Sequence, residues 1–451
     1  GSSQMPVPVP APAFHRMEVE MPPPPGPVEL EARERKFLTA LSFGLGISQG
    51  CGLCFYVGSG GYFGAVFDDE RFFVNACAFF YLPPILVTIL QLLLDRHFDM
   101  LLGIRPVILF RIYFSIFMVA LLLAVIGWVC ATQPYPGEGK LVYGLGAVLA
   151  VFAAILLGSA CLLFGAVDPR FVPYFVLGQT FAGVYTNASA RLLGFGPGCS
   201  VWKARAFFGL AAASVALGLL AYWCYNRYQL LERTYQHHET LLVYSQSLAS
   251  IPQDLRILPC GPQREISVAE RRGDVKTLGG FPLLCWSMVL CQAVAIAMNM
   301  SLTPLAYQVA HGSYDLTQEL VLVKLLSDFV GRSGFLLLVP KPTNQPGCRW
   351  PSVRSHALAV WLIELLRLPV WVSVYLWAIG SQVPSFLAQT GVLLWLVWLP
   401  LISTGALSSS WCFVVAVTAA PEEKRPEVNL LMSFSVYAGF ATGIVIALLT
   451  R

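Results

Sequence analysis

Charge is scarce in this sequence, and its scarcity excludes most soluble classes of protein. Only 12% of the 451 residues are charged and 56% are hydrophobic, whereas about 25% of a typical soluble chain is charged. The mean hydropathy is +0.66, so there is too little polar surface to keep the whole chain in water. A typical cytosolic enzyme, a secreted disulfide scaffold and a DNA-binding domain are therefore excluded. The net charge of +4 is also too small to indicate a nucleic-acid partner.

Signatures of metal-dependent and ATP-driven chemistry are missing as well. The sequence contains no HExxH motif and no phosphate-binding P-loop. Its 12 cysteines include one CxxC pair, Cys51 and Cys54, which lies in an apolar run without a second pair or a nearby histidine. We expect no metal, no cofactor and no enzymatic activity.

Long apolar runs occupy most of the chain. A membrane-spanning helix needs about 20 predominantly apolar residues, and backbone groups in lipid must form their hydrogen bonds internally. Eleven runs meet this requirement: 37–57, 72–94, 107–131, 141–166, 171–193, 203–225, 281–306, 318–340, 356–378, 387–412 and 428–450. The sequence therefore predicts an all-α polytopic membrane protein with 11 transmembrane helices.

The composition divides the chain into four parts. Residues 1–36 are rich in proline and predict a disordered tail. Six apolar runs lie in residues 37–225 and five in residues 281–451. Because the more polar stretch 226–280 separates them, we expect an N-terminal six-helix bundle, a connecting loop and a C-terminal five-helix bundle.

Lysine and arginine are distributed unevenly between the two sides of such a protein. If the tail is cytoplasmic, that side carries 19 of these residues and the opposite side carries 6. Loops rich in lysine and arginine stay on the cytoplasmic side of a membrane. We therefore expect a cytoplasmic N-terminus, a cytoplasmic 226–280 loop and an extracellular C-terminus, in the plasma membrane.

Charged residues inside an apolar run mark a solute pathway or a structural pair, because an isolated charge in lipid is costly. Asp328 and Arg332 lie four residues apart and therefore on one face of a helix. That face must point into the protein or a water-filled cavity, as a substrate site or as a pair that locks two helices together. Lys324 lies one turn earlier and could share the charge of Asp328 or extend outward, and we expect its long side chain to reach outward to the interface.

Other charged residues in the spans suggest structural or gating roles. Glu364 and Arg367 are spaced to meet on one helix face in the ninth run. Arg111 stands near the beginning of the third run, which favours an anchor at the membrane interface.

One charged motif resembles a known family, the equilibrative nucleoside transporters (solute carrier family 29). Asp328-Phe-Val-Gly-Arg332-Ser is similar to the eighth-span D-x-x-G-R-S signature, whose acid and arginine contact the ribose and base of a nucleoside. Further segments resemble the second, fifth, ninth, tenth and last spans of that family: 81–83, 177–183, 367–369, 403–408 and 432–443. The sequence departs from the family in the first span, which lacks the P-W-N motif, and at Leu157 and Leu325, where polar amides are usual.

The resemblance implies a divergent family member with a major-facilitator-like fold of six plus five helices. It implies facilitative, alternating-access transport of nucleosides, or of nucleobases, by a protein we expect to be a monomer in the lipid bilayer. The substrate would lie near the midplane between the bundles. The implied substrate-binding residues are Asp328, Arg332, Gln179, Tyr81, Cys51, Phe55, Pro304 and Phe440.

Three other functions stay open at this point. A proton-coupled nucleoside symporter would need an acid whose protonation is linked to substrate binding, and Asp328 is the candidate by its depth in the span. A major-facilitator carrier of another small organic solute would ignore nucleosides. In a non-transporting scaffold or receptor, Asp328 and Arg332 would be a structural pair only.

Overall fold

The computed structural model describes ten stretches of the chain, and all of them except the two-residue strand 277–278 are dominated by helix. The described residues are 31–68, 72–130, 138–167, 171–226, 277–278, 281–309, 314–338, 353–379, 398–420 and 424–449. The predicted tail and nearly all of the 226–280 loop lie outside these residues.

Helices are found within every one of the predicted apolar runs. Their bounds are α1 Ala32–Gly58, α2 Gly60–Phe67, α3 Phe72–Tyr81, α4 Pro83–Leu102, α5 Ile104–Val125, α6 Glu138–Val167, α7 Val172–Leu193, α8 Val201–Asn226, α11 Leu283–Val309, α12 Tyr314–Leu338, α13 Val353–Ile379, α15 Leu399–Ala419 and α16 Arg425–Leu449. A π-helical turn, Ile126–Cys130, extends α5. Two short antiparallel strands, β1 Thr277–Leu278 and β2 Phe281–Pro282, precede α11. The helical fold class predicted from the sequence is confirmed.

Nine stretches within the described residues are long and apolar enough to cross a membrane. The more polar α7 and α12 are not among these nine, although each has the length of a span. The count of eleven transmembrane helices therefore stays a prediction.

Two of the predicted runs have different bounds as helices. The second run contains two helices, because α4 begins at Pro83, where a proline without an N–H is tolerated. In the tenth run, α15 ends at Ala419, seven residues beyond the predicted end at 412. The beginning predicted for this run, residue 387, lies outside the described residues.

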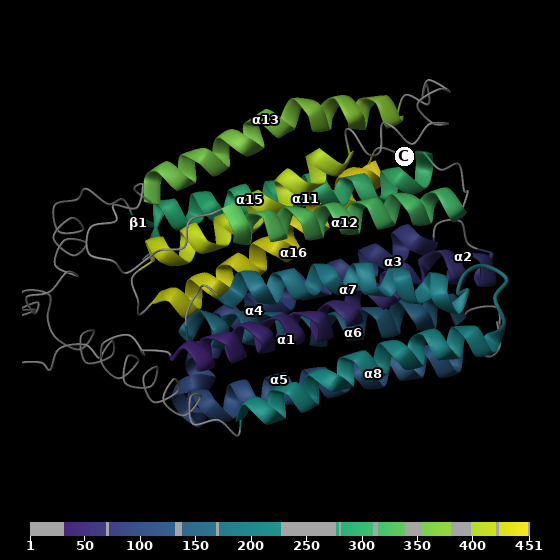
Figure 1. Ribbon diagram of the computed structural model, residues 1–451, viewed down its shortest axis with the longest axis horizontal. Coiled ribbons are helices and arrows are strands. Elements are labelled where there is room, and N and C mark those ends of the chain that lie inside the picture. The colour runs from purple at the N-terminus through teal and green to yellow at the C-terminus, as the bar shows by residue number, and fades with distance from the viewer. Residues whose placement is uncertain are drawn as a thin grey trace, which may run out of the picture.

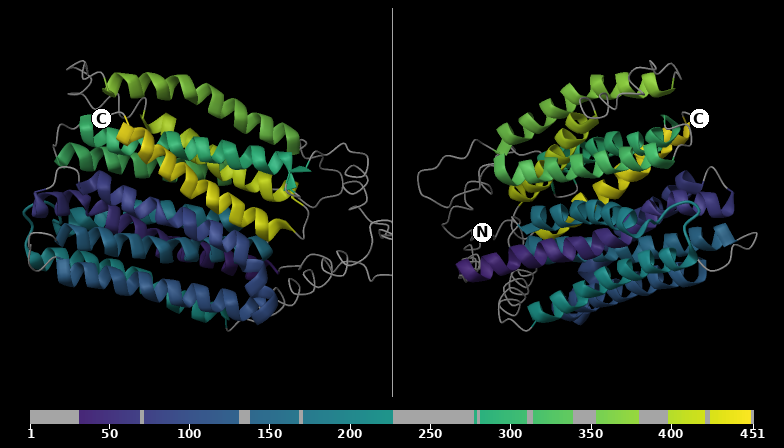
Figure 2. Two further views of the ribbon diagram at one scale, coloured as in Figure 1. Left: turned by 180° about the vertical axis from the view of Figure 1, so that it is seen from behind. Right: turned by 45° about the vertical axis from the view of Figure 1, so that its right-hand side comes forward.

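The long helices lie side by side in two groups with roughly parallel axes (Figure 1). In that view α1 to α8 occupy the lower half, and α11, α12, α13, α15 and α16 occupy the upper half. The same separation is visible from behind and after a 45° turn (Figure 2). The groups meet where α12 contacts α7, and where α16 contacts α3, α4 and α6. The domain boundaries expected at 225 and 281 stay a prediction.

Glycines let α1 and α7 pack with their backbones in contact. A Cβ atom at Gly46 would collide with the Phe175 carbonyl, and one at Gly178 would collide with the Phe43 carbonyl. Gly50 likewise faces the backbone of Gln179. Small residues at helix interfaces permit such close approach in membrane proteins. This contact fixes the position of Gln179, which matters for the site described below.

Replacing one of these glycines should separate the two helices. We expect Gly46→Ala to lower the melting temperature of the purified protein in detergent, because overpacking a contact typically costs about 1–3 kcal/mol. Gly44→Ala is the matched control on the same helix, since a Cβ atom there meets nothing within 4 Å. Equal melting temperatures for the two variants would contradict the packing described here.

Candidate functional site

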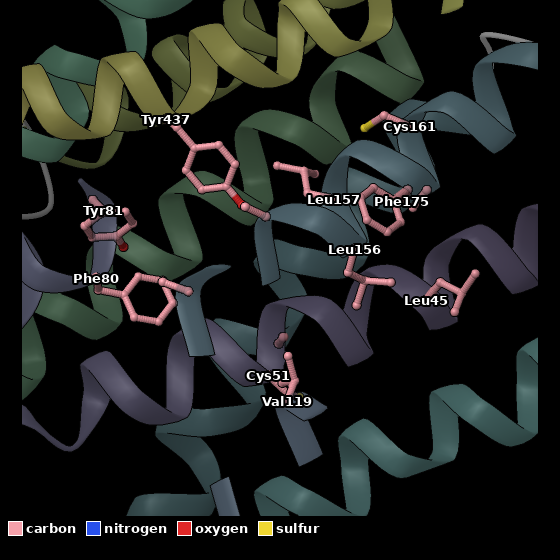
Figure 3. Close-up of a cluster of buried hydrophobic side chains, with 14 of the residues drawn as sticks. Leu45, Cys51, Phe80, Tyr81, Val119, Leu156, Leu157, Cys161, Phe175 and Tyr437 are labelled. Atoms are coloured by element: carbon pink, nitrogen blue, oxygen red, sulfur yellow. The ribbon is translucent and has the colours of Figure 1, made fainter. Parts of the chain in front are cut away.

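A cavity of about 220 Å³ lies between the two groups of helices. A single water needs about 10–15 Å³ on the same measure, so this volume suits a small organic molecule. One wall comes mainly from α1, α3, α6 and α7, and the other comes from α11, α12, α15 and α16. Figure 3 shows Tyr437 of α16 beside Leu157 and Cys161 of α6, with Phe80 and Tyr81 of α3 nearby.

The charged part of the wall belongs to α12. Asp328 and Arg332 both line the cavity, and their side chains are 22% and 14% exposed. The Arg332 Nε lies 3.9 Å from an Asp328 carboxylate oxygen, and its Nη1 donates a hydrogen bond of 3.2 Å to Ser410 Oγ on α15. The pair is therefore loose, held from one side and accessible from the cavity.

Lys324 also lines the cavity, which corrects the expectation that it reaches outward to the membrane interface. Its Nζ lies 3.7 Å from the Met300 sulfur on α11. The physical reason is its position on the helix. Residues four apart share a face, so Lys324 points the same way as Asp328 and Arg332.

The opposite wall carries a pair of glutamine amides. Gln179 Nε2 on α7 donates to Gln49 Oε1 on α1 at 2.6 Å, and Gln49 Nε2 donates to the Ala153 carbonyl at 3.3 Å. Both glutamines line the cavity. Gln179 was expected there from the family resemblance, whereas Gln49 was missed. A glutamine inside an apolar run is the signal that could have identified it.

Aromatic rings close the space between the walls. The rings of Tyr81 and Phe440 have centroids 4.7 Å apart, and Tyr437 lies within 6.3 Å of Phe440. All three residues line the cavity. Tyr437 was not expected from the sequence. Because it stands three residues before Phe440 on one helix face, the helical period could have indicated it.

The structure brings together five of the eight expected substrate-binding residues: Asp328, Arg332, Gln179, Tyr81 and Phe440. Cys51 and Phe55 do not line the cavity, which corrects their expected placement. Both are fully buried, and the Phe55 ring packs 4.6 Å from that of Phe207. They lie on the other side of α1 from Gln49 and Leu53, away from the cavity. Pro304 falls within α11, but its side chain lies outside the described part of the chain.

The two positions that depart from the nucleoside transporter pattern are also part of the wall. Leu157 of α6 and Leu325 of α12 both line the cavity. Leu157 is one turn from Ala153, whose carbonyl holds Gln49. The polar amides in this region therefore come from α1 and α7 rather than from α6.

The Glu364–Arg367 pair forms a separate network that does not line the cavity. Arg367 donates to Glu364, to Asn299 Oδ1 at 2.6 Å and to the Leu401 carbonyl at 3.0 Å, and Ser408 donates to Glu364. Glu364 and Arg367 are 2% and 5% exposed. The network joins α11, α13 and α15. This arrangement favours a structural role for the pair over the gating role that the sequence also suggested.

Arg111 also has a partner that the sequence did not indicate. Its Nη1 lies 2.7 Å from an Asp95 oxygen, so the pair joins α5 to α4. Because α5 begins at Ile104, Arg111 lies two turns inside the helix rather than at its beginning. The ion pair gives Arg111 a structural role between two helices, while its position at the membrane interface stays a prediction.

Residues 46–50, Gly-Ile-Ser-Gln-Gly, match the GxSxG pattern of esterases. That motif requires a sharp turn between a strand and a helix, with the serine exposed at its tip. Ser48 instead lies inside α1, is 1% exposed and donates to the Val215 carbonyl at 2.8 Å. The geometry of a nucleophile elbow is absent at this serine.

Comparison of the sequence with protein-family models and with curated proteins finds no match. Among solved structures, the chain is similar to the major facilitator proton:xylose symporter XylE, with a TM-score of 0.52 and 12% identity over 92% of this chain and 88% of that one. It is also similar to the human organic anion transporter MFSD10, with a TM-score of 0.51 and 16% identity over 92% and 94% of the two chains. The chain therefore has a major-facilitator-type fold.

Removing one member of the buried Glu364–Arg367 pair should destabilise the protein. We expect Arg367→Leu or Glu364→Leu to cost about 3–5 kcal/mol, because each leaves an uncompensated buried charge. The double variant should recover part of this loss, since both charges are then gone. The readout is the melting temperature in detergent, with Arg354→Leu, exposed on the same helix, as the control. A double variant as unstable as the sum of the single variants would contradict the pairing.

Proposed function

We propose that this chain is a facilitative nucleoside carrier, which can also accept nucleobases. The observation that carries the proposal is the placement of Asp328 and Arg332 in a cavity between two groups of helices. Carriers with a major-facilitator fold bind their solute between the two halves and expose it to each side in turn. A nucleoside combines ribose hydroxyls with a planar base, and the two cavity walls offer groups for both.

The charged wall suits the ribose. A carboxylate accepts hydrogen bonds and has no donor, so Asp328 would accept from ribose hydroxyls. A guanidinium only donates, so Arg332 would donate to a ribose oxygen or to an acceptor on the base. Because Ser410 holds the guanidinium from one side, its remaining N–H groups have a defined direction.

The opposite wall suits the base. The side chains of Tyr81, Phe440 and Tyr437 supply aromatic surface for a planar ring. Gln179 would hydrogen-bond the edge of the base, and Gln49 would orient it, since their amides are joined directly. These contacts would replace those of the polar residue that the nucleoside transporter family has at the position of Leu157.

The resemblance to equilibrative nucleoside transporters belongs to this proposal. It is supported by the position of the D-x-x-G-R-S motif, which places Asp328 and Arg332 on the cavity wall. We propose a divergent member of that family that works as a uniporter in the plasma membrane. In this orientation the N-terminus is cytoplasmic and the C-terminus is extracellular.

Uptake into cells that lack their own nucleoside carriers tests the proposal. Radiolabelled adenosine, inosine, uridine and hypoxanthine would be supplied at two external pH values. We expect saturable uptake that does not change with pH. Uptake that rises at acid pH would favour proton coupling instead. Absence of uptake of all four, with the protein at the cell surface, would overturn the proposal and favour a carrier of another organic solute.

Variants of the charged pair provide the residue-level test. We expect Asp328→Asn and Arg332→Gln to reach the surface and to lower nucleoside uptake about 10-fold or more, since a hydrogen bond to a charged group contributes about 1.5–3 kcal/mol. Val330→Ala is the matched control on α12, because Val330 is 51% exposed and faces away from the cavity. Normal uptake by both charge variants would disprove their role.

A further inference from the structure

A buried glutamine lies in the cavity wall beside the charged pair. Gln292 of α11 is 3% exposed, and it lines the cavity together with Ser409 and Ser410 of α15. Helix α15 contacts both α11 and α12, and Ser410 accepts the hydrogen bond from Arg332. Polar groups therefore follow one another along this wall from α12 through α15 to α11.

The amide of Gln292 uses half of its hydrogen-bonding capacity within the protein. Its Oε1 accepts from Ser435 Oγ at 2.7 Å, and its Nε2 donates to Ser409 Oγ at 3.4 Å. A primary amide has two N–H donors and an oxygen with two lone pairs. One donor and one acceptor therefore remain, and no group in the described part of the chain uses them.

The hydroxyl of Ser409 also has unused capacity. Its oxygen accepts from Gln292, and none of the described residues accepts its hydrogen. Ser435 differs from it, because Ser435 does not line the cavity and holds the Gln292 amide from α16. A buried polar group without a partner is unfavourable, so a solute that supplies both donors and acceptors would be stabilised at this place.

We infer that Gln292 and Ser409 bind the vicinal hydroxyl pair of a furanose ring. Each hydroxyl both donates and accepts hydrogen bonds, so the pair matches the free donor and acceptor of the amide and the free hydroxyl hydrogen of the serine. The inference rests on the proposed carriage of nucleosides. It identifies the ribose hydroxyls as the feature of the solute that α11 and α15 select.

The edge of a base also offers a donor beside an acceptor, and it is the rival ligand for Gln292. Two observations favour the ribose. Gln292 adjoins Ser410, which holds Arg332 of the charged wall. A second amide, Gln179, lies on the opposite group of helices and can take the edge of the base.

Inosine, its 2′,3′-dideoxy analogue and hypoxanthine test the inference. The two nucleosides differ only in the hydroxyl pair, and hypoxanthine is the base that they share. The purified full-length protein is titrated with each, and the ligand-induced rise in melting temperature gives an apparent affinity. We expect inosine to bind about 10-fold or more tightly than dideoxyinosine, because a site that hydrogen-bonds a hydroxyl discriminates against an analogue without it.

Variants assign this preference to particular residues, since Asp328 would also contribute to it. We expect Gln292→Met to lower the affinity for inosine about 10-fold and Ser409→Ala to lower it about 3-fold, because each neutral hydrogen bond contributes modestly. The affinities for dideoxyinosine and hypoxanthine should not change. Leu290→Ala is the matched control on α11, because Leu290 is 57% exposed and does not line the cavity.

Equal affinities for the two nucleosides in the unchanged protein, or no binding of inosine, would overturn the inference. A loss in both variants that is equal for inosine and dideoxyinosine would also overturn it, and an added loss for hypoxanthine would assign Gln292 to the base. Melting temperatures without ligand check folding, and Ser409→Ala removes only one oxygen atom. Uptake of inosine is measured separately, so carriage can fail while the hydroxyl preference holds, and the reverse.

Discussion

The requirement that a charge inside an apolar bundle find its compensation within the protein governs this structure. Two ion pairs satisfy this requirement in opposite ways. Glu364 and Arg367 are almost fully buried, and Ser408, Asn299 and a backbone carbonyl occupy their remaining hydrogen-bonding groups. Asp328 and Arg332 are 3.9 Å apart and partly exposed to the cavity. The first pair is closed and holds three helices together, whereas the second keeps groups available to a solute.

Close backbone packing determines what the second pair faces. Because Gly46, Gly50 and Gly178 bring α1 and α7 into backbone contact, the amides of Gln49 and Gln179 come within hydrogen-bonding distance across that interface. Larger residues at these glycines would separate the two helices and with them the two amides. The polar wall opposite α12 thus depends on residues that have no side chain and never touch the cavity.

Much of the fold could be predicted from the sequence because each helix is encoded by a local apolar run. The inward direction of Asp328 and Arg332 was also predictable, since lipid would not tolerate them. The same reasoning should have placed Lys324 inside, but the length of its side chain favoured an outward path to the interface. Cys51 and Phe55 were misplaced because α1 is apolar around most of its circumference, so its sequence does not mark the face that meets the cavity. The Gln49–Gln179 contact joins residues 130 positions apart, and no local pattern encodes such a pair.

The division of the binding groups between two walls has a mechanical consequence. The amides and Tyr81 belong to the helices before residue 226, whereas Asp328, Arg332 and Phe440 belong to the helices after residue 281. A solute shifts a conformational equilibrium only by its difference in affinity between the states. A solute that contacts both walls favours their approach, while one that contacts a single wall binds without favouring any movement. A carrier with this cavity would therefore select its solute by two requirements. The solute must bind the groups on α12, and the same molecule must also reach Gln179 and Tyr81 on the opposite wall.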